Sequence, residues 1–175
     1  MSKFLVIAEK PSVAQSYAKN LSAYKREDGY LEGESCIVSW CLGHLAEYAQ
    51  PEEYDPKYEK WQFDDLPILP EAWKLKVSKD KKKQFEVIKT LMNRSDVEYL
   101  VNGCDAGREG ELIFQRVYVL AGCRKPVKRL WISSMEDAAI QKGFQTMKSE
   151  EEYKNLCMAA VCRAQADWLI GMNGT

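Results

Sequence analysis

The sequence predicts an α/β fold in which a parallel β-sheet is covered by helices on both faces. Short apolar runs typical of buried strands alternate with stretches of helical periodicity along the 175-residue chain. Acidic residues follow two of these runs, as expected where chemistry gathers at the carboxyl edge of such a sheet. The length is sufficient for one domain with a sizeable core.

The first part of the chain predicts two buried strands separated by a helix and a hairpin. Residues 3–8 are a continuous apolar run with β-preferring side chains, typical of a central parallel strand. A proline then opens a predicted helix over residues 12–21. Gly29 and Gly33 predict a hairpin that leads into the second strand over residues 36–42.

Residues 44–75 differ in composition, holding four of the six prolines and many aromatic side chains. We interpret this segment as an ordered excursion, because it has too many large apolar anchors to stay disordered. Prolines fix its path, so its aromatics favour a core role over stacking on bases. A helix is predicted over residues 80–93, and the lysines at 79–83 indicate a solvated helix start more than a DNA contact.

The second part of the chain repeats the strand–helix alternation. Residues 97–102 predict a third strand, which runs into a glycine-rich turn and a helix ending near Leu120. A fourth strand is predicted over residues 127–132, followed by a helix over 136–147. These elements complete the predicted sheet.

Beyond residue 150 the small and apolar residues follow the spacing of one long helix. We interpret this helix as the truncated start of another, helical domain. The predicted organisation is therefore one domain over residues 1–149, with the excursion at about 44–75, and the beginning of a second domain over 150–175.

Composition limits the classes of function. The chain has 25 basic and 26 acidic residues, which argues against binding DNA by phosphate neutralisation alone and favours a local catalytic site. No apolar run approaches the ~20 residues of a membrane span, and the N-terminal run is too short for a signal peptide. We expect a cytoplasmic monomer without membrane contact, whose six cysteines are reduced and structural.

Three carboxylates mark the predicted site. Glu9 ends the first strand, Asp105 ends the third, and Glu109 begins the next helix. If the two strands are neighbours, these side chains converge, and a hard cation such as Mg²⁺ would neutralise them. Glycines at 103, 107 and 110 would let the backbone approach a phosphate. A single acid at a strand end, by contrast, is more often a helix cap or a solvated turn.

Several ordered blocks carry a family resemblance. Residues 8–12 (AEKPS) and 105–113 (DAGREGELI) resemble the two Toprim motifs of type IA DNA topoisomerases, of the bacterial topoisomerase III group. The further blocks similar to that family are residues 43–45, Trp61, 66–70, 129–134 and 159–173. This resemblance covers essentially the whole chain. It implies a Toprim (Rossmann-like) fold and an ATP-independent isomerase that transiently breaks and rejoins single DNA strands, giving relaxation or decatenation.

The resemblance also implies roles for individual residues. Glu9 would handle the proton on the leaving 3′-oxygen, and Lys10 would steady the scissile phosphate. Asp105 and Glu109, together with Glu9, would hold Mg²⁺, with Arg108 contributing to the same site. Gly107 stands where the family's commonest Asp-x-Asp-x-Glu pattern has its second aspartate, which predicts a more loosely held ion.

Lys10, His44, Arg129 and Arg163 are the expected DNA contacts. For His44, a buried and hydrogen-bonded structural role is an equally open alternative. For Arg129 and Arg163, the alternative is a surface arginine without a specific role.

The family's cleavage reaction needs a tyrosine nucleophile. None of the nine tyrosines is followed by the Pro-Arg-Thr context of the family, so the nucleophile is expected beyond Thr175 and the chain alone is expected to be inactive. Its expected partners are a single-stranded DNA segment and the remaining domains of the same polypeptide. The alternatives are a primase-like or nuclease Toprim protein and a non-enzymatic phosphate-receiver-like domain, which Glu9-Lys10 fits poorly.

Overall fold

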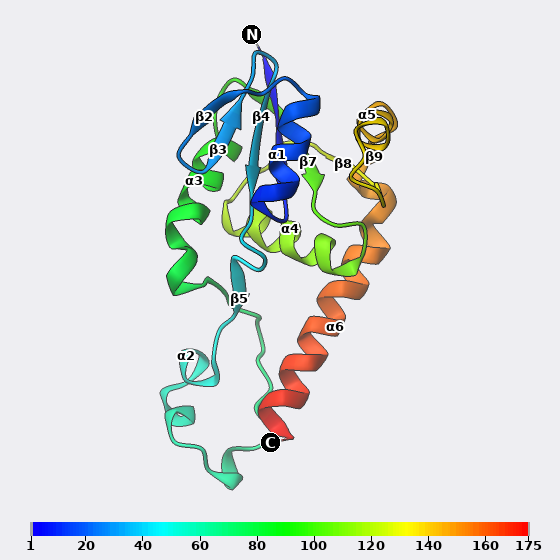
Figure 1. Cartoon of the computed structure of the whole chain (residues 1–175). Coiled ribbons are helices and arrows are strands. Elements are labelled where there is room, and N and C mark those ends of the chain that lie inside the picture. Colours follow the sequence, from blue (N-terminus) through cyan, green and yellow to red (C-terminus); the bar gives the residue numbers. More distant parts are fainter. Residues whose placement is uncertain (1, 175) are drawn as a thin grey trace.

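The computed structural model describes residues 2–174, and its elements follow the predicted alternation (Figure 1). The strands are β1 Lys3–Ala8, β2 Lys25–Glu27, β3 Tyr30–Glu32, β4 Cys36–Trp40, β5 Ala46–Tyr48, β6 Leu75–Val77, β7 Val97–Gly103, β8 Val127–Arg129 and β9 Lys148–Ser149. The α-helices are α1 Pro11–Asn20, α2 Pro51–Tyr54, α3 Lys82–Met92, α4 Arg108–Leu120, α5 Asp137–Gln145 and α6 Lys154–Asn173. Short 3-10 helices are η1 Pro56–Glu59, η2 Phe63–Asp65, η3 Lys79–Lys81 and η4 Glu150–Tyr153.

The main sheet has the strand order β2-β3-β4-β1-β7-β8-β9. Its four central strands, β4, β1, β7 and β8, are parallel as predicted. The short strands β2, β3 and β9 pair antiparallel at the two edges, so the sheet is mixed rather than wholly parallel. Strand β8 is also shorter than the predicted residues 127–132, since it ends at Arg129.

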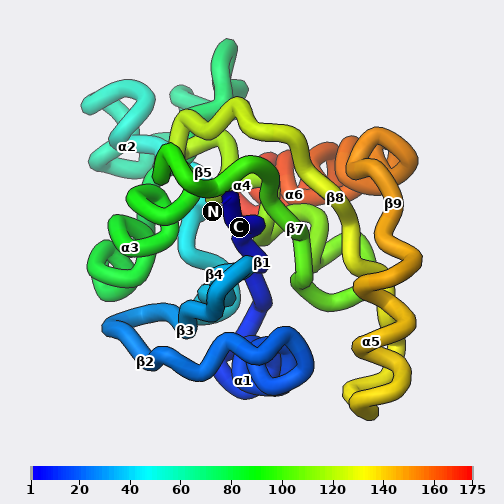
Figure 2. The backbone as a smooth tube through the Cα atoms, turned by 90° about the horizontal axis from the view of Figure 1, so that it is seen from above, coloured from blue at the N-terminus to red at the C-terminus, as the bar shows by residue number. Residues whose placement is uncertain are grey.

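Helices cover both faces of this sheet, as predicted. Side chains alternate along β1, so that Leu5 and Ile7 enter one core while Val6 and Ala8 enter the other. Helices α3 and α4 cover the first core, and α1 and α5 cover the second, which Figure 2 shows on opposite sides of the strands. Strand β1 is therefore buried on both faces, the position expected of a continuous apolar run.

The segment between β4 and α3 is ordered and extends away from the sheet, as Figure 1 shows. Strands β5 and β6 pair antiparallel within it, and its aromatics pack against the C-terminal half of α6. The rings of Trp73 and Trp168 meet edge-on at 5.4 Å between centroids, and Trp168 Nε1 donates a hydrogen bond to the carbonyl of Ala49 at 3.1 Å. The prediction of an ordered, aromatic-cored excursion is confirmed, although Trp61 and Phe63 remain exposed.

Helix α6 is the long helix predicted after residue 150. It spans 20 residues and runs beside α4 toward the tip of the excursion (Figure 1). Its hydrophobic contacts with the excursion include Trp168 and Leu169. Among residues 2–174, no helix combines the length and the apolar character that crossing a membrane requires.

Candidate active site

Three chain segments meet at the carboxyl edge of the central strands. Strands β1 and β7 are parallel neighbours with Ala8 opposite Gly103, so Glu9 and the β7–α4 loop emerge side by side. On the other side of β1, the amide of Gly43 donates to the carbonyl of Glu9 at 3.3 Å. This places His44 at the same edge. The condition that the sequence left open, adjacency of the first and third predicted strands, is met.

Glu9 is buried, yet one of its carboxylate oxygens has no hydrogen-bond partner among the residues that the structure describes. Its Oε1 lies 3.4 Å from Nζ of Lys10, whose side chain is largely exposed. Its Oε2 is buried and accepts no hydrogen bond from any residue between 2 and 174. Because an unsatisfied buried carboxylate oxygen is costly, the atom is suited to a proton, a cation or a donor from a bound substrate.

The β7–α4 loop is held by the guanidinium of Arg129, which is fully buried. Its Nη1 donates to the carbonyls of Asn102 at 3.0 Å and Cys104 at 2.6 Å, and its Nη2 donates to the carbonyl of Asp105 at 2.8 Å. Its Nε pairs with Glu111 Oε1 at 2.5 Å. The prediction that Arg129 contacts DNA is wrong. Its side chain is fully buried and its donors point inward to the loop carbonyls, so they do not face a phosphate outside the protein.

Two further groups tie the loop to the core. Tyr17 in α1 donates from its hydroxyl to the carbonyl of Gly103 at 3.1 Å, and burial raises the pKa of Tyr17 far above its usual range, so it remains a donor. The buried thiol of Cys104 has its pKa raised by a hydrogen bond with Cys41 and by burial. It therefore stays an unreactive thiol. All six cysteines are free in the structure.

The predicted metal ligands share this edge without forming a closed cluster. Asp105 and Glu109 are exposed, and Glu109 Oε1 is in close contact with Nε2 of His44. Within the described residues, no three His, Cys, Asp or Glu side chains are grouped so as to hold a metal ion. Glu9, Asp105 and Glu109 thus lie at the same edge of the sheet but do not converge as predicted. The carboxylate of Glu109 points toward His44.

The donor chemistry nevertheless fits a hard cation. All three candidate ligands are carboxylates, the oxygen donors that Mg²⁺ prefers, and Mg²⁺ commonly keeps several waters in place of protein ligands. The orphaned Oε2 of Glu9 supplies one unsatisfied acceptor. Space for another ligand exists at Gly107, since a Cβ built there meets nothing within 4 Å.

Arg163, distant in sequence, is brought to the same region. A cleft of about 190 Å³ separates the start of α4 from α6 and is lined by Arg108, Glu109, Leu112, Ala160, Arg163, Ala164 and Asp167. Both arginines are exposed, although Arg163 Nε also lies 3.7 Å from Asp167. Two cations beside a helix N-terminus suit an anionic ligand such as a phosphate.

Glu111 and Arg116 are site-supporting residues that the sequence reasoning missed. Both are buried on α4, Glu111 against Arg129 and Arg116 beside His44. The signal was present in the sequence: two charged residues interrupt the apolar face formed by Leu112, Ile113 and Val117. A buried charge on such a face needs a partner, and that expectation would have identified both.

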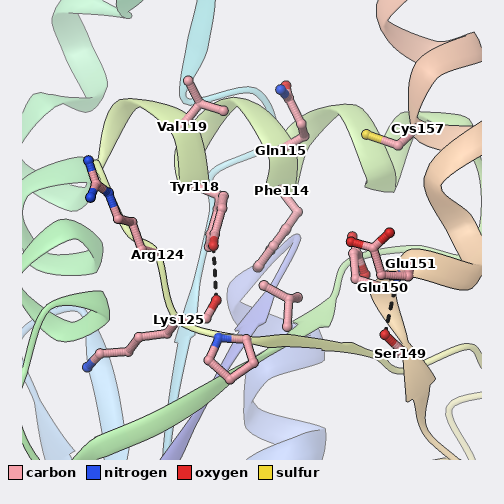
Figure 3. Close-up of a pocket in the computed structure, with 12 residues that line it drawn as sticks. Phe114, Gln115, Tyr118, Val119, Arg124, Lys125, Ser149, Glu150, Glu151 and Cys157 are labelled. Atoms are coloured by element: carbon pink, nitrogen blue, oxygen red, sulfur yellow. Dashed lines mark hydrogen bonds between the residues drawn. The ribbon is translucent and has the colours of Figure 1, made fainter.

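A larger pocket of about 520 Å³ lies away from these residues (Figure 3). It is formed by the C-terminal half of α4, the loop before β8, and η4 with the start of α6, and none of the predicted site residues lines it. Tyr118 donates to the carbonyl of Lys125 across its wall at 2.9 Å. Glu150, at the edge of this pocket, receives a 3.2 Å hydrogen bond from Asn102.

Glu150 makes stability depend on pH. Burial, and then the neighbouring Glu111, raise the pKa of Glu150 from 4.5 to about 7. Because the pKa is raised in the folded state, the stability that the protonated carboxyl contributes is fully present below pH 4.5. This stability is lost as the pH rises through about 7. Glu150→Gln mimics the neutral form, and we expect it to be more stable than wild type at pH 8. The expected difference is only about 1–2 kcal/mol, because the carboxyl is partly exposed and solvent weakens the effect.

Urea unfolding at pH 5 and pH 8 measures this effect. At pH 5 the variant and the wild type are expected to be nearly equal in stability. Glu151→Gln is the matched control, because its side chain is exposed, and it is expected to show no such pH-dependent difference. A Glu150→Gln effect of equal size at both pH values would contradict the assignment.

The fold and this set of residues define a Toprim domain. The model of the Toprim domain family matches residues 4–135, and the chain belongs to that family. Over all 175 residues it is 50% identical to DNA topoisomerase 3 of Bacillus subtilis (strain 168) and 49% identical to DNA topoisomerase 3 of Bacillus licheniformis. The homology to DNA topoisomerase 3 confirms the resemblance seen in the motifs.

The chain spans about a quarter of the length of these relatives, 24% in each case. Among solved structures, full-length topoisomerase I from Thermotoga maritima matches with a TM-score of 0.54 and 18% identity, over 83% of this chain and 21% of that one. At that identity the match concerns the fold alone, and it agrees with the predicted α/β Toprim architecture.

Proposed function

We propose that this chain is the Mg²⁺-binding catalytic part of a type IA DNA topoisomerase, which breaks and rejoins single DNA strands during relaxation or decatenation. The observation that carries the proposal is the adjacency of β1 and β7, which sets Glu9 and Lys10 beside the loop of Asp105 and the first turn of α4, where Glu109 lies. The supporting comparison is the identity of about 50% to DNA topoisomerase 3 along the whole chain.

In this reaction Glu9 exchanges the proton of the leaving 3′-oxygen through its unpartnered Oε2. Lys10, largely exposed beside it, neutralises the scissile phosphate. Asp105, Glu109 and Glu9 would hold Mg²⁺, and the ion would supply positive charge to the phosphate oxygens. Arg108 and Arg163, on either side of the cleft at the start of α4, bind the DNA backbone.

The proposed context is a larger polypeptide. The relatives are about four times as long as this chain. The tyrosine nucleophile is proposed to lie in another domain of the whole protein. Residues 1–175 alone are therefore not expected to relax DNA. Residues 1–149 form the Toprim domain and 150–175 begin the next one. The whole protein is proposed to act as a cytoplasmic monomer on single-stranded DNA segments.

The alternatives are less well supported. A primase-like or nuclease Toprim protein would share only the Toprim region, whereas the identity to DNA topoisomerase 3 continues past residue 135 through α6. A phosphate-receiver-like domain does not account for the excursion that packs on α6. Neither alternative has an observation of its own in its favour.

Mg²⁺ titration followed by calorimetry and NMR tests the proposal. We expect weak binding that Asp105→Asn and Glu109→Gln each abolish. Gly107→Asp is expected to strengthen binding roughly tenfold, because the added carboxylate meets no steric barrier and brings one more charge to the ion. Glu98→Gln, an exposed acid on β7, is the matched control and should leave binding unchanged. Binding that survives both ligand substitutions would refute the metal assignment.

A further inference from the structure

His44 is the single histidine of the chain, and both of its ring nitrogens face charged side chains. Its Nε2 is in close contact with Oε1 of Glu109. Its Nδ1 lies 3.5 Å from Nη1 of Arg116. The imidazole is therefore placed between an acceptor on one side and a donor on the other.

Arg116 is buried, and no carboxylate in the described part of the chain pairs with it. Across residues 2–174 its guanidinium is held by neutral groups: Nη1 donates to the carbonyl of Ala46 at 3.2 Å, and the group lies 4.6 Å from the ring centre of Tyr48. Its Nε meets no acceptor among the described residues. Because an unpaired buried cation is expensive, Arg116 is better explained by its effect on His44 than by a gain in stability.

A guanidinium has donors but no acceptor. The nitrogen that faces it must therefore present a lone pair, which places the single proton of the neutral imidazole on the other nitrogen. For His44 that nitrogen is Nε2, which then donates to Oε1 of Glu109. The other oxygen of Glu109 stays free of this hydrogen bond.

We propose that Arg116 is a positioning residue that sets the tautomer of His44 and thereby orients Glu109. The inference deepens the proposed function, since it rests on Glu109 being a ligand of Mg²⁺. It assigns His44 the role of a hydrogen-bond donor that steers a metal ligand. Through Tyr48, which packs on Trp73 in the excursion, it also links the position of Glu109 to the excursion.

Because His44 is the single histidine, its ring signals need no assignment, and two-bond ¹H–¹⁵N correlation spectra read the tautomer directly. At about pH 8 we expect the wild-type ring to carry its proton on Nε2, because Nδ1 faces the donors of Arg116 and Nε2 faces the carboxylate of Glu109. Arg116→Met is expected to raise the share of the Nδ1–H tautomer several-fold. Arg116→Lys keeps a cationic donor and is expected to restore the Nε2–H form, which a merely structural role would not predict.

Arg124→Met is the control, because Arg124 is exposed, and it should leave the tautomer unchanged. A wild-type Nδ1–H form, a doubly protonated ring, or an unaltered tautomer in folded Arg116→Met would overturn the proposal. Should Arg116→Met fail to fold, the wild-type and Arg116→Lys spectra still decide.

Addition of Mg²⁺ separates this inference from the proposed function. If Glu109 is a metal ligand, Mg²⁺ will shift the Nε2 signal of His44 in the wild type. If the tautomer depends on Arg116 but Mg²⁺ leaves His44 unshifted, the positioning role stands and the assignment of Glu109 as a metal ligand fails.

Discussion

Arg129→Met is expected to lower the free energy of unfolding by about 3–5 kcal/mol, the cost of breaking one side of a buried ion pair. The substitution leaves the fully buried Glu111 without its cation. It also removes the donors that the carbonyls of Asn102, Cys104 and Asp105 accept from. The loop that carries Asp105 should therefore loosen together with the core.

Urea unfolding of the single and double variants measures this effect. Glu111→Met combined with Arg129→Met is expected to be more stable than Arg129→Met alone, because no unpaired buried charge remains. It should still fall short of wild type, since the carbonyls of Cys104 and Asp105 lose the hydrogen bonds that Arg129 donates. Arg124→Met is the surface control, expected within about 0.5 kcal/mol of wild type. If Arg129→Met lowered the free energy of unfolding as little as the surface control, Arg129 would not be the residue that holds the β7–α4 loop.

Gly110→Ala is the second substitution with a large expected effect. A Cβ at this position would lie 2.0 Å from the carbonyl oxygen of Asp105 and 3.0 Å from its carbonyl carbon. The obstacle is backbone held by Arg129, so the loop must move rather than a flexible side chain. We expect a loss of roughly 2–3 kcal/mol in unfolding free energy from overpacking, together with a displaced Asp105 and weaker Mg²⁺ binding.

Gly107→Ala is the matched control in the same turn, because a Cβ there has no neighbour within 4 Å. Unfolding free energy and the amide resonance of Asp105 should be compared for the two variants. The Asp105 signal is expected to shift in Gly110→Ala and to stay close to its wild-type position in Gly107→Ala. Equal behaviour of the two variants would show that close approach at Gly110 does not set the loop.

Much of the fold could be predicted because its elements have strong local signals. The run of residues 3–8 coincides with β1, and the predicted helices over 12–21 and 80–93 agree with α1 and α3 to within two residues at each end. The edge strands β2, β3 and β9 have only two or three residues each. Periodicity cannot identify such short strands. The glycines at 29 and 33 did predict the hairpin that β2 and β3 form, whereas β9 had no such signal, and the antiparallel pairing of these strands makes the sheet mixed.

The candidate site divides along the same line. Glu9, Lys10, Asp105, Arg108 and Glu109 could be proposed from sequence, because acids at strand ends and a glycine-rich turn are local patterns and the family motifs are contiguous. How far apart these side chains lie in space could not be predicted, because the contact of Glu109 with His44 joins residues 65 positions apart in the chain. That contact directs Glu109 toward His44, and the three carboxylates form no closed cluster within residues 2–174.

The sequence alone determined the α/β class, the order of the central elements and the acidic strand ends, because hydrophobic period and turn chemistry act between near neighbours in the chain. Only the tertiary structure decided what each arginine does. Arg129 lies inside the core as a clamp, Arg163 stands exposed across a cleft from Arg108, and Arg116 faces His44. The physical reason is that burial and pairing of a charge depend on which distant elements pack around it, and no local pattern encodes that.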